Sequence, residues 1–300
     1  MAFPTGTETS TSLASLIPAI WGERVNDFFK QKLVMADFFI NRSEDVSAGG
    51  SVLYTPNLSE MSANTKSNAT AVTLNNTTES KITLSINTWK EVSFAIEDAE
   101  AAQVKHSYYL MEKYAKNAGY TIARTLENAL GTIFGTFTSS VGSSTVNIAD
   151  SDIRSAIATL EANNVDTTTE VAWFFDSKVF WNQLQSIDKF SLAVNAPVQD
   201  PVAKRPTAML YGIPVYITNS VQYVSGTTGR YNALAQNDAI HFATSPLGDG
   251  GSMGGMVGQH GIRVQSHYVP EYLSTLTTAD ILYGVVLNRA NAGINVISPA

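Results

Sequence analysis

The chain has 300 residues, which is enough for a sizeable core or for two domains at roughly 150 residues per domain. Charged residues make up 15% of it, whereas a typical soluble domain has about 25%. The formal net charge of −7 and the absence of a long basic run argue against a protein that holds nucleic acid by neutralising its phosphates. Cysteine is absent, which excludes disulfides, zinc–thiolate sites and cysteine nucleophiles.

The first element that the sequence predicts is a helix beginning at Pro18. Apolar residues recur at helical spacing at positions 21, 25, 28, 29 and 33, and proline is tolerated in a first turn. This segment is either an early core helix or an arm that docks on another surface. No stretch of the chain reaches the roughly 18 apolar residues that a membrane span needs, so we expect no membrane contact.

Residues 48–96 have a different pattern. Apolar and polar residues alternate at 82–86 and again at 92–96, which is typical of half-buried strands, and the stretch 57–70 is rich in Asn, Ser and Thr. We predict one long antiparallel ribbon with a polar tip. Because a two-stranded ribbon is only marginally stable alone in water, it lies either on a sheet of its own chain or across a neighbouring subunit.

Residues 98–136 carry the clearest helical signal. Apolar residues from Val104 to Ile133 follow one another by three or four positions without a break. A helix of this length would measure roughly 55 Å. Its stripe contains Ala and Tyr in place of a leucine heptad, so we predict a helix that lies on a sheet, with Gly119 as its weakest point.

After a Ser- and Gly-rich stretch at 139–144, helix and strand patterns alternate. Asp150 or Ser151 can cap a helix, and Asp176 can cap a second helix directly after an apolar run. The predicted strands lie at 171–175, 209–211, 215–217, 239–243, 262–268, 281–287 and 294–297. The fold class that these patterns indicate is α+β.

The search for catalytic chemistry yields one weak candidate. Residues 250–254 match the G-x-S-x-G pattern of hydrolases, with Ser252 in the nucleophile position. No strand runs directly into this loop, and the glycines that follow cannot continue a helix. The histidines lack metal-ligand spacing, and no phosphate-binding glycine motif occurs. We therefore predict no catalytic residue, no cofactor and no metal site.

Taken in chain order, the predicted elements resemble the major capsid protein of tailed bacteriophages, which has the Hong Kong 97-like fold. The resemblance covers nearly the whole chain, and in the second of its segments Ser51 replaces an acidic residue of that family's pattern. The segments that carry it are 17–21 (IPAIW), 50–56 (GSVLYTP), 92–98 (VSFAIED), 123–127 (ARTLE), 212–215 (GIPV), 283–286 (YGVV) and 292–294 (AGI).

The resemblance implies a structural function. Copies of the chain would assemble as hexamers and pentamers into an icosahedral shell that encloses double-stranded DNA. Residues 1–47 would form an N-terminal arm and residues 48–96 an extended β-hairpin loop. Residues 97–140 and 262–300 would form a peripheral domain with a long spine helix, and residues 141–261 a central α/β domain.

The resemblance also implies partners and a location. The arm and loop would lie on neighbouring subunits, with contacts at Trp21, Phe28, Pro56, Glu60, Lys66 and Asn68. The other expected partners are a separate scaffolding protein, a portal protein, a decoration protein and packaged DNA contacted non-specifically. The protein would be part of a virion capsid assembled in the cytoplasm of a bacterial host.

The alternatives are an encapsulin-like shell of a cellular nanocompartment and a serine hydrolase that uses Ser252.

Overall fold

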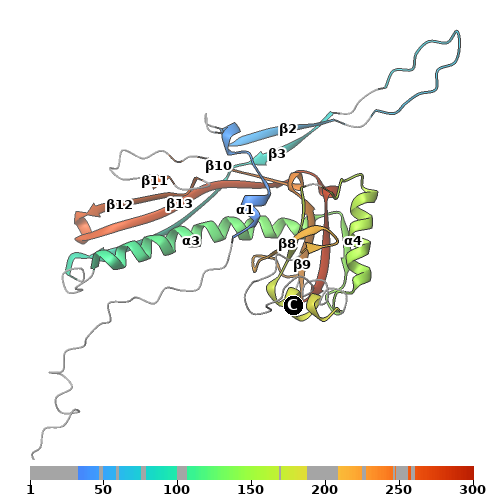
Figure 1. Cartoon of the computed structure of the whole chain (residues 1–300). Coiled ribbons are helices and arrows are strands. Elements are labelled where there is room, and N and C mark those ends of the chain that lie inside the picture. The colour runs from blue at the N-terminus through green and yellow to red at the C-terminus, as the bar shows by residue number, and fades with distance from the viewer. Residues whose placement is uncertain are drawn as a thin grey trace, which may run out of the picture.

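A computed structural model gives the fold of the chain. It describes residues 33–46, 50–58, 61–75, 79–99, 107–168, 170–187, 209–224, 228–245, 247, 256–257 and 261–300. Two six-stranded sheets, a separate two-stranded ribbon and one long helix, α3 (Ser107–Ile133), make up the framework. In Figure 1, α3 lies along the first sheet, the second sheet stands at the end of the helix, and the ribbon lies on the opposite side of the first sheet.

The first sheet is built around β13 (Ser274–Leu287), its longest strand. Its strand order is β1 (Ile40–Asn41), β10 (Ile240–Ser245), β13, β12 (Arg263–Val269) and β11 (Met256–Val257), and β4 (Thr88–Glu97) also pairs with β13. The pairing of β13 with β4 is antiparallel and runs over ten positions. β13 therefore pairs with three strands, β4, β12 and β10, along its length.

The ribbon consists of β2 (Val52–Leu58) and β3 (Glu79–Ser85), paired antiparallel. The prediction of a single ribbon over residues 48–96 is wrong for its last part, because β4 leaves the ribbon and joins the first sheet. Val92 and Phe94 of β4 pack against the main core, which explains this pairing. Alternation in the sequence predicted the strand, but it does not specify the strand's partner.

The second sheet and its helices form the other half of the body. Its strand order is β5 (Ser139–Gly142), β14 (Gly293–Pro299), β9 (Gly229–Gln236), β6 (Val171–Phe175), β8 (Ile213–Ile217) and β7 (Met209–Leu210). Helices α4 (Asp150–Ala162) and α5 (Ser177–Asn182) contribute buried residues to the core on this sheet. Short 3₁₀ turns lie at Ser43–Val46, Phe134–Thr136, Leu184–Ser186, Asn237–Ala239, Pro270–Tyr272 and Ala290–Ala292.

Helix α3 confirms the predicted long helix over its described length. It runs unbroken for 27 residues, about 40 Å, and passes through Gly119 without interruption. Residues 100–106 lie outside the described part, and the predicted end at 136 is replaced by a 3₁₀ turn from Phe134 to Thr136. From residue 113 to the end of α3, where burial is described, the buried side chains are Ala118, Ile122, Leu126, Glu127 and Leu130.

The main core joins both sheets. Phe134 after α3, Phe174 on β6 and Phe242 on β10 are fully buried in one cluster. The short helix α1 (Met35–Phe38) inserts Met35 into the same cluster, and Phe39 stacks on Phe174 with ring centres 5.4 Å apart. The described residues before β1 are therefore an integral part of the body.

Candidate assembly interface

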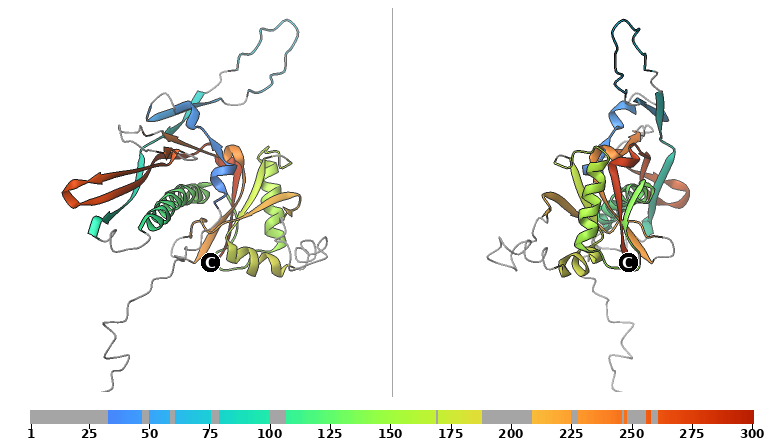
Figure 2. Two further views of the ribbon diagram at one scale, coloured as in Figure 1. Left: turned by 60° about the vertical axis from the view of Figure 1, so that its left-hand side comes forward. Right: turned by 90° about the vertical axis from the view of Figure 1, so that its right-hand side faces the viewer.

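The ribbon of β2 and β3 projects beyond the rest of the body, as Figures 1 and 2 show from three directions. The ammonium group of Lys81 lies 4.2 Å from the centre of the Tyr54 ring, a cation–π contact between the two strands. Large apolar side chains are exposed on β2 at Val52, Tyr54 and Leu58. Because a two-stranded ribbon with exposed apolar side chains is marginal in water, this surface is suited to being covered.

The tip of the ribbon is described for residues 61–75, and every one of these residues is exposed. Polar contacts within the tip hold it together. The side-chain amide of Asn64 donates to Oδ1 of Asn75 at 3.0 Å, and Nζ of Lys66 donates to the carbonyl of Ser67 at 2.9 Å. Large apolar side chains of the tip are exposed at Met61, Val72 and Leu74, and Leu74 has an exposed fraction of 86%. The tip therefore offers both apolar and neutral polar groups to a partner.

Three of the six predicted contact residues fall on this surface. Pro56 lies on β2, and Lys66 and Asn68 lie in the tip; all three are exposed. Trp21, Phe28 and Glu60 lie outside the described residues. A contact with a neighbouring copy stays a prediction for each of the six.

The base of the ribbon has a small core of its own. Leu84 and Ile86 are buried there together with Val46 and Ala243. The backbone N–H of Ile86 donates to the carbonyl of Ser51 at 2.8 Å, which closes the base. The ribbon therefore combines a fixed base with an exposed tip.

A second feature lies where the described chain begins, at α1. The carboxylate of Glu127, on α3, accepts hydrogen bonds from the backbone N–H groups of Val34 at 2.7 Å, Met35 at 2.9 Å and Ala36 at 3.2 Å. These are N–H groups at the start of a helix, which find no carbonyl partner inside the helix. Glu127 is 0% exposed; its hydrogen bonds from Val34 and Met35 are buried, and the one from Ala36 is partly buried.

Burial raises the pKa of Glu127 above its ordinary value of 4.5. The hydrogen bonds from Val34, Met35 and Ala36 act in the opposite direction and lower the pKa, while the negative charge of Asp37 raises it further. The net direction of the pKa shift is upward, because removal of the carboxylate from water and the charge of Asp37 together outweigh the three hydrogen bonds that it accepts.

This shift predicts a pH-dependent difference in stability. A carboxyl group whose folded pKa lies above its unfolded pKa contributes stability below the unfolded value, and this contribution is lost as the pH rises through the folded pKa. Between pH 4.5 and neutral pH we therefore expect the free energy of unfolding of the parent to fall relative to that of Glu127→Gln. Urea unfolding at several pH values measures the difference. Glu271→Gln, at an exposed position, is the control, and a matching pH trend in both variants would contradict the prediction.

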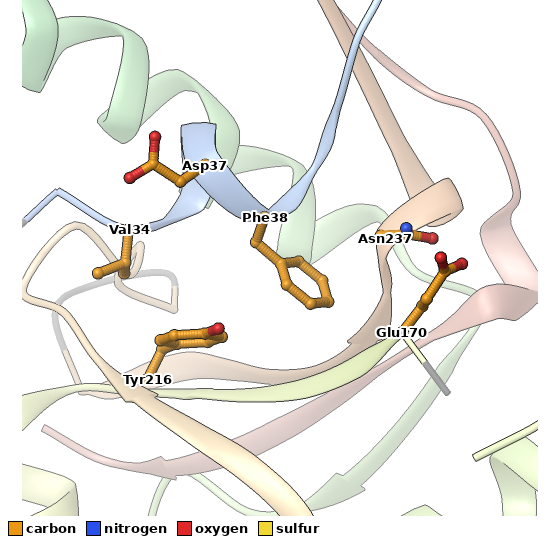
Figure 3. Close-up of a pocket in the computed structure, with 6 residues that line it drawn as sticks. All are labelled: Val34, Asp37, Phe38, Glu170, Tyr216 and Asn237. Carbon is orange, nitrogen blue, oxygen red and sulfur yellow. The ribbon is translucent and has the colours of Figure 1, made fainter. Parts of the chain in front are cut away.

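A pocket of about 380 Å³ lies beside α1 (Figure 3). Phe38 packs against Tyr216 with ring centres 5.9 Å apart, and Figure 3 shows the carboxylates of Asp37 and Glu170 on opposite sides of Phe38. The lining residues are Val34, Asp37, Phe38, Glu170, Tyr216 and Asn237. They include no Ser–His or Cys–His pair of the kind that nucleophilic catalysis uses.

In the described part of the chain, no group of three or more His, Asp and Glu side chains is placed to hold a metal ion. Ser252, the nucleophile of the hydrolase alternative, lies outside the described residues. None of the described helices combines the length and the apolar character needed to cross a membrane.

Comparison with known proteins identifies the fold. No protein-family model matches the sequence, and no curated protein matches it. A chain of Mycobacterium phage Che8 is similar in structure with a TM-score of 0.70 and 15% identity, over 93% of this chain and 96% of that one. The capsid of the cyanophage P-SCSP1u matches with a TM-score of 0.71 and 13% identity, over 99% of this chain and 96% of that one. This chain has the fold of a phage capsid protein.

A third solved structure agrees. The mature capsid of bacteriophage PhiM1 matches with a TM-score of 0.70 and 10% identity, over 99% of this chain and 96% of that one. The capsid fold confirms the α+β class and the capsid-protein architecture that the sequence resemblance implied. In the described part of this chain, the projecting ribbon, with its exposed apolar side chains, is a surface suited to contacts outside the subunit.

Proposed function

We propose that this chain is the major capsid protein of a tailed bacteriophage, with a structural and not a catalytic function. The observation that carries the proposal is the match of the capsid fold over nearly the whole chain. The exposed ribbon supports it, because its apolar side chains need a covering partner. In a shell, that partner is a neighbouring copy of the same chain.

In this proposal, copies associate as hexamers and pentamers into an icosahedral shell around double-stranded DNA. Of the predicted arm, residues 1–47, the part that precedes the described residues is proposed to lie on a neighbour, because residues 33–46 belong to the body of the subunit itself. Of the predicted loop, residues 48–96, the projecting ribbon is proposed to do so, because β4 belongs to the first sheet. Neutral polar groups in the tip form hydrogen bonds there without the desolvation cost of charged groups. The contact residues are Trp21, Phe28, Pro56, Glu60, Lys66 and Asn68.

The proposed division of the rest of the chain agrees with the two sheets only in part. In the proposal, residues 97–140 and 262–300 form a peripheral domain with α3 as its spine, and residues 141–261 form a central domain. The observed pairing crosses this outline, because β4 and β10 belong to the first sheet and β14 belongs to the second sheet. The central part therefore includes a strand from the C-terminal segment.

The proposed partners follow from the same role. A separate scaffolding protein guides assembly, a portal protein occupies one vertex, and a decoration protein is a further candidate for the outer surface. Contact with packaged DNA is non-specific, in keeping with the net charge of −7. Assembly takes place in the bacterial cytoplasm.

Assembly of the purified chain tests the proposal. We expect the full-length chain, expressed in bacteria together with the genes that flank its own, to form closed particles of megadalton mass with five-fold vertices. Size-exclusion chromatography with light scattering and electron microscopy measure this. A chain that stays a monomer or a small oligomer under these conditions would count against the proposal.

The same preparation separates the alternatives. Particles that enclose a cellular enzyme and no DNA would indicate a nanocompartment shell. A small oligomer that reacts with a fluorophosphonate probe, and loses this reaction in Ser252→Ala, would indicate a serine hydrolase. Large particles that do not react with the probe agree with the capsid proposal.

A further inference from the structure

Helix α1 is too short to be stable alone. It spans four residues, whereas isolated helices of fewer than about 12 residues are marginal in water. Met35 and Phe39 hold it through burial in the main core. Phe38 packs against Phe174 and Tyr216, and Glu127 adds hydrogen bonds from the N–H groups at the start of the helix. The first described turn of the chain therefore depends on contacts from distant elements.

The carboxylate of Glu127 determines the position of α1 on α3 in a way that the apolar contacts of α1 do not. Buried apolar side chains tolerate small shifts along a helix, because dispersion contacts have little directionality. Two carboxylate oxygens that accept three N–H groups require a defined distance and angle for each bond. These three hydrogen bonds fix the position of α1 along the axis of α3.

In the described part of the chain, the hydrogen bonds of the Glu127 carboxylate are the three from Val34, Met35 and Ala36, and no cation pairs with it there. Burial and the charge of Asp37 together raise its pKa despite these bonds. An apolar side chain in this place would leave the three N–H groups without their acceptor, which costs free energy for each buried group. The carboxylate therefore holds the start of α1 against α3.

We propose that Glu127 is the positioning residue of α1: it fixes the point on α3 at which the described chain begins. As a result, residue 33, to which residues 1–32 are joined, lies at the same place in every copy. The anchoring itself is independent of the proposed capsid function; only its consequence for contacts between copies rests on that function.

Amide hydrogen exchange in the full-length free subunit tests the anchoring. In Glu127→Leu we expect the amides of Val34, Met35 and Ala36 to exchange about 10- to 100-fold faster, because each loses its acceptor. In Glu127→Gln one oxygen becomes an NH₂ group, so Ala36, which bonds Oε2, should lose protection while Val34 and Met35, which bond Oε1, keep theirs.

The controls separate this pattern from general loosening. Asn128→Ala removes an exposed side chain next to Glu127 on α3 and should leave all three amides protected. Circular dichroism and the exchange of α3 amides check that each variant is folded. Unchanged exchange at Val34, Met35 and Ala36 in Glu127→Gln and Glu127→Leu would overturn the proposal, and so would equal acceleration throughout α3.

Particle formation adds a second, separable measurement. We expect Glu127→Leu subunits to give fewer closed particles than Asn128→Ala subunits under the same conditions. If the parent chain forms no particles, the capsid proposal fails while the exchange result still tests the anchor. If Glu127→Leu loses its amide protection but assembles as the parent does, the anchoring holds and its consequence for contacts between copies is refuted.

Discussion

A chain that lacks residues 61–75, with a short Asn-Gly turn joining the remaining ends, is expected to fold as the parent does but to form no closed particles. All of these residues are exposed, and their hydrogen bonds are made within the tip. Their loss therefore removes little from the subunit. It does remove the exposed side chains of Met61, Val72 and Leu74, which a neighbour would cover. Thermal unfolding and electron microscopy measure the two effects.

A matched substitution shows whether the apolar groups of the tip matter. Leu74→Ser in the full-length chain should reduce the yield of particles, whereas Val146→Ser should not, although Val146 is also an exposed apolar residue. Val146 lies far from the ribbon in sequence, between β5 and α4. Normal particles from the chain without residues 61–75 would refute the role assigned to the tip.

Gly284→Ala is expected to lower the free energy of unfolding by about 2 kcal/mol, as an overpacked site does. A Cβ at Gly284 would lie 2.2 Å from the carbonyl oxygen of Ser85 and 3.1 Å from the Cα of Ile86. Both are backbone atoms, so the clash cannot be relieved by a change of rotamer. The base of the ribbon must shift away from β13, and we expect faster amide exchange at Ile86. Urea unfolding and hydrogen exchange measure these effects.

Gly119→Ala is the control for this substitution. A Cβ at Gly119 meets no atom within 4 Å, and the residue lies inside α3. Alanine there is expected to raise the free energy of unfolding by about 1 kcal/mol, because glycine is the weaker helix former. If the two substitutions change the free energy of unfolding in opposite directions, the result supports a close approach of β13 to the base of the ribbon at Gly284. Equal stability of the parent and Gly284→Ala would contradict it.

Elements determined by local signals could be predicted from the sequence. The apolar run at 171–175 predicted a buried strand, and β6 buries all five residues. Asp176 was predicted to cap the next helix, and its carboxylate accepts the N–H of Lys178 at 2.9 Å. The predicted cap at Asp150 or Ser151 is wrong, because the N-cap position is Ala149, and Asp152 accepts the Ala149 N–H at 2.9 Å. Cap positions shift easily by one or two residues.

Elements determined by tertiary contacts could not be predicted. β9 contains Gly, Asn, Ala and Gln, and its sequence has little strand character. It forms a strand because it lies between β14 and β6. The buried side chain of Asn232 connects it to both, since its amide donates to the Val296 carbonyl at 3.0 Å and its oxygen accepts the Asp176 N–H at 2.9 Å.

The candidate site divides in the same way. The ribbon and its polar tip were visible in the sequence, because alternation and composition are local. The contacts of Glu127 were not, because its partners are more than 90 residues away and lie at the start of a four-residue helix. The only signal was an acid next to Leu126 on the buried stripe of an amphipathic helix, which a helical pattern alone assigns to the border of the apolar face.

The crossing of β13 beneath the ribbon also has a mechanical consequence. β13 spans 14 residues, about 45 Å, and is bonded along its length to β4, β12 and β10. A pull on the ribbon reaches β13 through the contact at Gly284, and the strand then spreads the load over three neighbours at once. A displacement of the base of the ribbon is therefore resisted by hydrogen bonds along the whole length of β13.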